Sequence, residues 1–241
     1  MGPRDRSAPS AVGFAVEFHQ PALLTTVSPD GPVFVLASAS PARLRVLRAA
    51  GVDPVVQVSD VDEDAILDAL PAATPATEVV SALARAKAES VAATPEIAAL
   101  ADRSAPVVLI GCDSMLHLGD RLLGKPHTPE RALEQWREMR GAQADLLTGH
   151  HLMRLDGGSG AHATGTSSTT VRFADATDEV IRQYVASGEP LGVAGAFTLD
   201  GLGGWLVAGI DGDPSSVIGI GLPLVRGLIE RVGLSVTDFW H

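Results

Sequence analysis

The chain has 241 residues, of which 46% are hydrophobic and 20% are charged. This composition is typical of a folded globular protein with one large domain or two small ones, and it argues against disorder. The 29 acidic residues outnumber the 18 lysines and arginines, so the formal net charge is −11. An acidic surface repels the phosphates of DNA and RNA, which excludes a general nucleic-acid binder, although a few cations in a cleft can still hold a small phosphorylated ligand.

The ends of the chain and its single cysteine indicate where the protein works. Glu17 interrupts the short apolar run 12–18, so no secretory signal peptide is predicted, and no segment qualifies as a membrane span. Cys112 has no partner for an internal disulfide and fits a reducing compartment. We therefore expect a cytoplasmic protein with no membrane partner. Residues 1–31 are predicted to be an irregular extension, followed by one domain over residues 32–241.

The predicted elements alternate between strands and helices. Continuous apolar runs predict buried strands at 33–37 and 107–111. Ser40 followed by Pro41 predicts the start of a helix, since serine is a good N-cap and proline suits the first helical position. The remaining expected strands are 55–58, 146–155, 164–173 and 205–210, and the remaining helices are 78–93, 128–140, 177–187 and 223–232. The two strands around the glycine-rich segment 156–160 predict a hairpin, so we expect an α/β fold with a mixed sheet.

Polar residues at the start of the first predicted helix form a candidate anion site. Ser38, Ser40 and Arg43 follow the strand 33–37, at the carboxyl end where ligands bind in α/β sheets. Free N–H groups at a helix start, neighbouring hydroxyls and an arginine one turn later suit a phosphate group. The alternative is a capped helix with a surface arginine.

Two acidic positions are candidates for metal binding or proton transfer. Asp113 follows the apolar run 107–111, and a carboxylate at the tip of a buried strand is well placed to bind Mg²⁺ or to accept a proton from water. The alternative is a turn aspartate that bonds to its own backbone. Glu63 lies in the acidic run 59–64, which could supply a ligand for a hard cation, although such charge runs are more often a solvated surface.

Three other features are judged structural or incomplete. The segment 119–126 matches the start of a Walker phosphate loop, but Pro126 replaces the required serine or threonine, so only Lys125 is kept as a possible phosphate contact. His150 and His151 would point to opposite faces of a strand, so we do not expect both to bind one metal. Cys112 is expected to be a small buried residue, because no histidine lies near it in sequence to activate it.

Taken in order, the polar segments resemble the Maf family of nucleoside triphosphate pyrophosphatases across roughly residues 33–234. A single motif of this kind would be weak, whereas the ordered set is specific. The segments are VLASASPAR (35–43), SDVDE (59–63), LARAKA (83–88), GCDS (111–114), GKP (124–126), GEPL (188–191), AGAF (194–197), GLG (201–203) and GIGLPL (219–224).

The resemblance implies a two-lobed α/β fold like that of the inosine triphosphatases, with a mixed, curved sheet and flanking helices. It also implies metal-dependent hydrolysis of a nucleoside triphosphate to the monophosphate and pyrophosphate, with Mg²⁺ or Mn²⁺ as the cofactor, and a possible homodimer. By matching positions, Asp113 would be the catalytic proton acceptor and a metal ligand together with Glu63. The substrate-binding residues would be Ser38, Ser40, Arg43, Lys87, Ser114, Lys125 and Asp200.

Departures from the family pattern bear on the choice of nucleotide. Ala42 stands where the family commonly has a first arginine, and Asp200 stands where the branches that resemble UTP or 7-methyl-GTP hydrolases carry Gln or Glu. Asp200 would accept hydrogen bonds from a base, or it is a turn aspartate before Gly201. The alternative function, from the role historically attached to the family, is a regulatory protein that arrests cell division at the septum.

Overall fold

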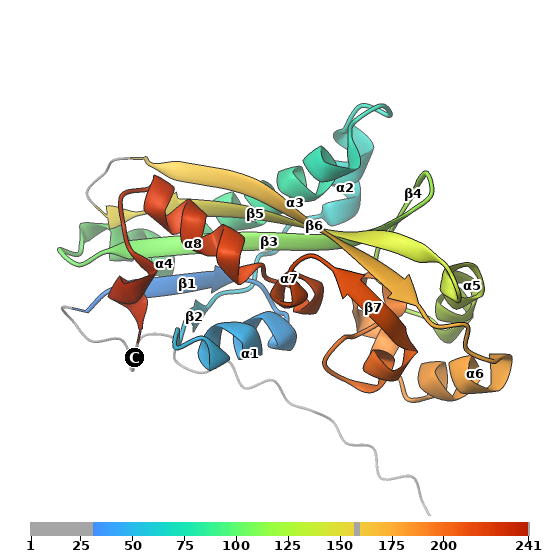
Figure 1. Cartoon of the computed structure of the whole chain (residues 1–241). Helices are drawn as coiled ribbons and strands as arrows, with labels where there is room; N and C mark the ends of the chain where they lie inside the picture. The colour runs from blue at the N-terminus through green and yellow to red at the C-terminus, as the bar shows by residue number, and fades with distance from the viewer. Residues whose placement is uncertain (1–30, 157–159, 241) are drawn as a thin grey trace, which may run out of the picture.

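The computed structural model describes residues 31–156 and 160–240. Its seven strands form one mixed sheet in the order β2-β1-β3-β5-β6-β7, and β4 pairs with β3 outside this path (Figure 1). The pairs of β1 with β2 and with β3 are parallel, and the others are antiparallel. The strands are β1 (Val33–Ala37), β2 (Val55–Val56), β3 (Val107–Leu118), β4 (Arg121–Leu123), β5 (Gln143–Arg154), β6 (His162–Phe173) and β7 (Val207–Asp211).

Helices cover both faces of the sheet (Figure 1). The α-helices are α1 (Pro41–Ala49), α2 (Glu63–Ala69), α3 (Ala76–Ala92), α4 (Pro95–Ala98), α5 (Pro129–Met139), α6 (Asp178–Ala186), α7 (Pro214–Ile218) and α8 (Leu222–Arg231). None of the helices among the described residues has the length and apolar character needed to cross a membrane.

The long strands β3, β5 and β6 run through two lobes. In one lobe the alternating side chains of β1 separate two cores: Phe34 and Leu36 pack with α1 and α8, whereas Val33 and Val35 pack with α3 and α4. In the other lobe the far ends of the long strands pack against α5 and α6 around the fully buried Trp136. The predicted two-lobed α/β fold is confirmed.

Several predicted elements are confirmed to within a few residues. The first strand occupies 33–37 as expected, and Ser40 caps α1 by accepting a hydrogen bond from the backbone N–H of Arg43 at 3.4 Å. The hairpin of β5 and β6 pairs antiparallel along its whole length. Residues 1–30 lie outside the described residues, so the irregular extension and the boundaries of the domain stay predictions.

The predicted end of the strand 107–111 is wrong. β3 continues to Leu118, so Asp113 lies in the middle of a strand rather than at its tip. The apolar run ends early because Asp113 and Ser114 line a polar cleft, but the backbone of this part of β3 still pairs with β5, from Cys112 opposite His150 to His117 opposite Asp145. Hydrogen bonding to a neighbour, rather than hydrophobicity, keeps this segment extended.

The acidic run 59–64, for which no element was predicted, contains the start of a helix: Asp62 caps α2 by accepting from the backbone N–H of Ala65, and Glu63 is the first helical residue. A negative side chain is favourable at that end of a helix. The strand expected at 205–210 begins later, at Val207, because Leu202–Leu206 forms a 3₁₀ helix.

Asp156 anchors the end of β5 to the start of β3. Its Oδ1 accepts from the backbone N–H of Val107 at 2.8 Å, and its Oδ2 accepts from Nη2 of Arg154 at 2.7 Å. Burial opposes ionisation of this carboxyl, but the hydrogen bonds from Arg154 and Val107 outweigh it and lower the pKa of Asp156.

We expect Asp156→Ala to lower the free energy of unfolding by about 1–3 kcal/mol at neutral pH, since it leaves a buried N–H group without an acceptor. The ionised carboxylate stabilises the fold above the unfolded-state pKa of about 4, and this contribution is lost as the pH falls through the lower folded-state pKa. Urea unfolding of both proteins at about pH 7 and about pH 3 measures it. An equal loss at both pH values would contradict the electrostatic part of this account.

Candidate active site

The cleft opens where β1 ends and β3 continues. Ala37, the last residue of β1, pairs with Gly111, and β4 joins β3 only from Leu116 onward. Between these points the described part of the sheet places no strand beside β3 on that side. A cleft of about 550 Å³ lies here, lined by residues of both lobes. This cleft lies at the carboxyl end of β1, where the sequence analysis placed the candidate anion site, and β3 lines it through Asp113 and Ser114.

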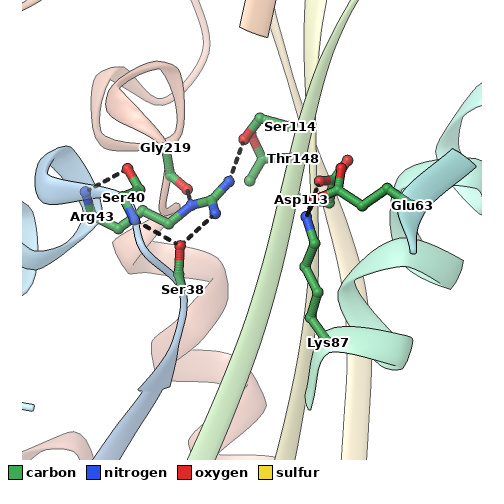
Figure 2. Close-up of polar contacts among 9 residues, drawn as sticks. All are labelled: Ser38, Ser40, Arg43, Glu63, Lys87, Asp113, Ser114, Thr148 and Gly219. Atoms are coloured by element: carbon green, nitrogen blue, oxygen red, sulfur yellow. Dashed lines mark hydrogen bonds and ion pairs between the residues drawn. The ribbon is translucent and has the colours of Figure 1, made fainter. Parts of the chain in front are cut away.

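Two consecutive residues of β3 serve opposite faces of the sheet. Side chains alternate along a strand, so Asp113 points toward α2 and α3 and Ser114 points toward α1 (Figure 2). Both side chains line the same cleft, because no neighbouring strand covers this edge within the described residues. Asp113 and Ser114 therefore belong to two different clusters of polar side chains, one around Lys87 and one around Arg43.

Glycines allow α3 to lie directly on the sheet. A Cβ atom at Gly111 would lie 2.2 Å from the carbonyl oxygen of Ala84, and one at Gly149 would lie 2.3 Å from that of Val80. Gly149 pairs with Asp113 across the β3–β5 ladder. This close approach brings Lys87, one turn after Ala84, within reach of Asp113.

Lys87 joins two carboxylates in the first cluster. Its Nζ donates to Oδ1 of Asp113 at 2.6 Å and lies 2.9 Å from Oε1 of Glu63 (Figure 2). Lys87 and Asp113 are only 7% and 6% exposed, whereas the side chain of Glu63 is 44% exposed. The cluster thus has a buried end at Asp113 and a solvent-facing end at Glu63.

The two carboxyl groups respond differently to this environment. Burial raises the pKa of Asp113, although the charges of Lys87 and Arg43 act in the opposite direction. Burial also opposes ionisation of Glu63, but the hydrogen bond from Lys87 and the nearby cations outweigh it and lower the pKa of Glu63. Asp113 is therefore the stronger base of the two, and Glu63 is the more permanent negative charge.

Arg43 organises the second cluster. Its Nε donates to the carbonyl oxygen of Gly219 at 2.8 Å, its Nη1 to Oγ of Ser38 at 2.9 Å, and its Nη2 to Oγ of Ser114 at 3.1 Å (Figure 2). Oγ of Ser114 also lies 3.0 Å from Oγ1 of the fully buried Thr148. Arg43 is therefore a buried, fixed cation at the start of α1, and the reading of it as a surface arginine is wrong.

Lys125 and Asp200 border the same cleft from the second lobe. Lys125 follows β4, is exposed, and makes no salt bridge within the part of the chain that the structure describes. Oδ2 of Asp200 accepts from Nη2 of Arg45 in α1 at 2.8 Å. Lys125 is thus free to bind an anion, whereas Asp200 is paired across the cleft.

All nine predicted site residues line this cleft: Ser38, Ser40, Arg43, Glu63, Lys87, Asp113, Ser114, Lys125 and Asp200. Four contributors were missed by the sequence analysis: Arg45, Thr148, Glu189 and the backbone of Gly219. Glu189 belongs to the GEPL segment, so a motif marked it without indicating a role. Gly219 is likewise the first residue of the GIGLPL segment, whereas no local signal identifies Arg45 or Thr148, because each contacts a partner far away in sequence.

The two histidines and the cysteine that the sequence analysis judged structural are all buried. Nε2 of His150 accepts from the backbone N–H of Gly221 at 3.0 Å, and Nδ1 of His151 lies 2.7 Å from Oγ1 of Thr164. Burial lowers the pKa of both histidines to about 4, so both are neutral at physiological pH. Burial also raises the pKa of Cys112 to about 11, which keeps its thiol protonated and unreactive.

The donor set suits a hard cation that shares its coordination with a substrate. Among the described residues no group of three or more His, Cys, Asp or Glu side chains is placed to hold a metal ion. Of the four carboxylates that line the cleft in the described part of the chain, Asp113 and Glu63 lie against the same ammonium group, that of Lys87. Mg²⁺ is commonly held by one or two carboxylates, several waters and substrate phosphates, so the residues present fit such an ion.

Residues 33–232 match the model of a protein family described as "Maf-like protein". The match spans both lobes and every residue placed in the cleft above. The chain belongs to the Maf-like family. The resemblance found in the ordered motifs is thereby confirmed.

Curated relatives cover most of this Maf-like chain. A protein of Nocardia farcinica is 61% identical over 209 residues, which are 86% of this chain and 96% of the relative. A protein of Mycolicibacterium gilvum is 57% identical over 208 residues, or 86% of this chain and 98% of the relative. One from Saccharopolyspora erythraea is 53% identical over 209 residues, or 86% and 96%. Each of the three is named nucleoside triphosphate pyrophosphatase.

Proposed function

We propose that the protein hydrolyses nucleoside triphosphates between the α- and β-phosphates and releases a nucleoside monophosphate and pyrophosphate. The observation that carries the proposal is the buried carboxylate of Asp113, which shares one cleft with Arg43, Lys87 and Lys125, three of the four cations that line it among the described residues. The names of relatives that are 53–61% identical support it. The activity would remove non-standard nucleotides.

The chain's own residues supply binding and proton transfer. Arg43 and Lys125 would bind phosphate oxygens, and Lys87 would hold Asp113 in place while adding positive charge. Asp113 would orient a water molecule and accept its proton as the water oxygen bonds to the α-phosphorus. The bond from that phosphorus to the bridging oxygen then breaks, and pyrophosphate leaves with the bonding electrons. The raised pKa of Asp113 makes it a better base for this role than an ordinary aspartate.

A divalent cation, Mg²⁺ or Mn²⁺, is part of the proposal. Asp113 and Glu63 would hold it, and when bound it would supply neutralisation of phosphate charge. The lowered pKa of Glu63 keeps one ligand ionised over a wide pH range. Removal of divalent ions with a chelator should abolish turnover, and added Mg²⁺ or Mn²⁺ should restore it.

Release of pyrophosphate from a panel of nucleoside triphosphates tests the proposal directly. The expected result is equal amounts of monophosphate and pyrophosphate, with little release of single phosphate. If no nucleotide in the panel releases pyrophosphate with either metal, the proposed function is overturned. A purely regulatory role in division arrest would leave the Lys87–Asp113–Glu63 cluster without a purpose, and the burial of Asp113 beside Lys87 therefore favours the enzyme.

Lys125→Ala should raise KM by about tenfold or lower kcat similarly, and to the same extent for all triphosphates, because Lys125 meets phosphate rather than the base. Its exposure means that the thermal stability should stay unchanged. Arg121→Ala is the matched control: Arg121 lies in the same hairpin, pairs with Glu138 at 2.9 Å, and does not line the cleft. Steady-state kinetics of both variants decide the point, and equal effects of the two would remove Lys125 from the site.

The proposal also includes a cytoplasmic location and a homodimer. The single, buried Cys112 supports a reducing compartment. Leu202 and Trp205, which are 51% and 87% exposed in one 3₁₀ helix, support an apolar contact between copies. Sedimentation of the full chain, compared with Trp205→Ser, tests the dimer.

A further inference from the structure

An ion pair crosses the mouth of the cleft. Arg45 belongs to α1 in the first lobe, and Asp200 belongs to the loop before the 3₁₀ helix of the second lobe, 155 residues later. Nη2 of Arg45 lies 2.8 Å from Oδ2 of Asp200. Both side chains line the cleft that holds Asp113. The pair thus links the two walls of the candidate active site.

Stability does not explain this pair. The side chain of Arg45 is 62% exposed and that of Asp200 is 30% exposed. Exposed ion pairs contribute about 0–1 kcal/mol, so the link between the lobes would be weak. An arginine has five N–H donors and a carboxylate has about four acceptor positions, so a single hydrogen bond leaves most of both unused. The unused positions are available to a ligand in the cleft.

The loop that carries Asp200 is hydrogen-bonded to the carboxylate of Glu189. Oε1 of Glu189 accepts from the hydroxyl of Thr198 and from the N–H of Gly203, and Oε2 accepts from the N–H of Leu202 at 3.0 Å. A Cβ atom at Gly201 would lie only 2.7 Å from the same carboxylate, so the backbone lies directly against Glu189. Residues 198–203 are therefore tied at three points to one carboxylate, which sets the position of the backbone that carries Asp200.

The cleft around the Arg45–Asp200 pair is suited to bind the nucleobase of a nucleotide. The cleft is lined by the charged side chains of Lys87, Asp113 and Lys125 and also by the apolar side chains of Val58, Phe197 and Leu199, the last of which directly precedes Asp200. Ala42, three residues before Arg45 and on the same helical face, is too small to fill the space beside it. A nucleotide with its triphosphate at the charged end would direct the edge of its base toward Arg45 and Asp200.

We propose that Arg45 is a specificity-determining residue that acts together with Asp200 to distinguish keto bases from amino bases. This inference rests on the proposed function. The pair presents a donor beside an acceptor. Uracil, thymine and hypoxanthine present the complement, a carbonyl oxygen beside a ring N–H, whereas cytosine and adenine present an amino group beside a ring nitrogen that accepts.

The relative depth of the two side chains sets the direction of the preference. In a pyrimidine the substituent at position 4 points away from the sugar, and the nitrogen at position 3 lies nearer to it. The side chain of Arg45 is the more exposed of the two, and the proposal therefore assigns Arg45 to the outer substituent and Asp200 to the inner nitrogen. A carbonyl at position 4 accepts from Arg45, whereas an amino group there would place two donors against each other. The pair therefore favours the keto base.

Two pairs of nucleotides that differ only in this feature provide the test: UTP against CTP, and ITP against ATP. The ratio of kcat/KM, keto over amino, should be at least about tenfold in the wild-type protein. It should fall toward one in Arg45→Ala. The charge-reversed double variant Arg45→Asp with Asp200→Arg should invert the preference. Arg48→Ala is the matched control and should leave both ratios unchanged. Arg48 lies on the same helix as Arg45, pairs with Asp53 at 2.7 Å and does not line the cleft.

Binding of the products UMP and CMP, measured by calorimetry, gives a second readout that does not require turnover. The same variants should shift the ratio of the two dissociation constants in the same direction. Wild-type ratios near one, or ratios that stay unchanged in the charge-reversed variant, would overturn the role of Arg45 while leaving pyrophosphate release intact. Loss of pyrophosphate release from every nucleotide with the binding ratios preserved would instead overturn the proposed function. Thermal unfolding of each variant checks that this exposed pair can be changed without loss of the fold.

Discussion

Replacing Asp113 with asparagine is expected to lower turnover by at least about 10²-fold, the scale of a general base, while the fold stays intact. The change keeps the size of the side chain but removes the charge that would accept a proton and bind a cation. Lys87 keeps its ion pair with Glu63 at 2.9 Å, so no buried charge is left without a partner. Pyrophosphate release under saturating nucleotide and metal measures the effect.

Asp120→Asn provides the control for Asp113→Asn. Asp120 is an exposed aspartate in the turn between β3 and β4, seven residues further along, and it does not line the cleft. Its replacement should leave turnover unchanged. Circular dichroism and thermal unfolding establish that the Asp113 variant is folded. Near-normal turnover in that folded variant would remove Asp113 from the mechanism.

The sequence predicted the elements whose signals are local. Ser40 and Pro41 mark the start of α1 through capping chemistry, and the apolar run 33–37 marks β1 because that strand is buried on both faces. The length of β3 could not be predicted in the same way. Its second half is held by the ladder to β5, a partner about 30 residues later, while Asp113 and Ser114 line a polar cleft.

In the candidate site, the sequence likewise predicted the residues but not their contacts. Ordered motifs identified Arg43, Lys87 and Asp113, and all three line the cleft. The hydrogen-bond and ion-pair partners of each side chain, however, could not be predicted from the motifs. Arg43 is fixed by the carbonyl of Gly219, 176 residues away, and Asp200 is paired with Arg45 rather than left free. Such contacts follow from the packing of two lobes and have no local sequence signature.

Replacing Lys87 with methionine is expected to abolish activity and also to destabilise the protein. The ammonium group lies 2.6 Å from Asp113 and 2.9 Å from Glu63, and both Lys87 and Asp113 are buried. Its removal leaves the Asp113 carboxylate buried beside a second negative charge. Breaking a buried pair in this way costs about 3–5 kcal/mol. Urea unfolding at neutral pH measures the loss, and kcat should fall alike for all triphosphates.

The pH dependence of the Lys87→Met variant identifies the cause of its instability. Burial already raises the pKa of Asp113 in the folded protein, and loss of Lys87 raises that pKa further. Above its folded-state pKa, ionised Asp113 opposes folding. This penalty disappears once the pH falls to about 4, the unfolded-state value, because the carboxyl is then protonated in the folded protein. The stability deficit of the variant should therefore shrink on acidification.

The double variant Lys87→Met with Asp113→Asn separates electrostatics from packing. Removing the buried carboxylate as well should recover most of the stability at neutral pH, while pyrophosphate release stays lost. Recovery of this kind is expected only if the penalty comes from an unpaired charge, because methionine fills nearly the same space in all of these proteins. A double variant that is as unstable as Lys87→Met would show instead that the unpaired charge of Asp113 is not the cause of the instability.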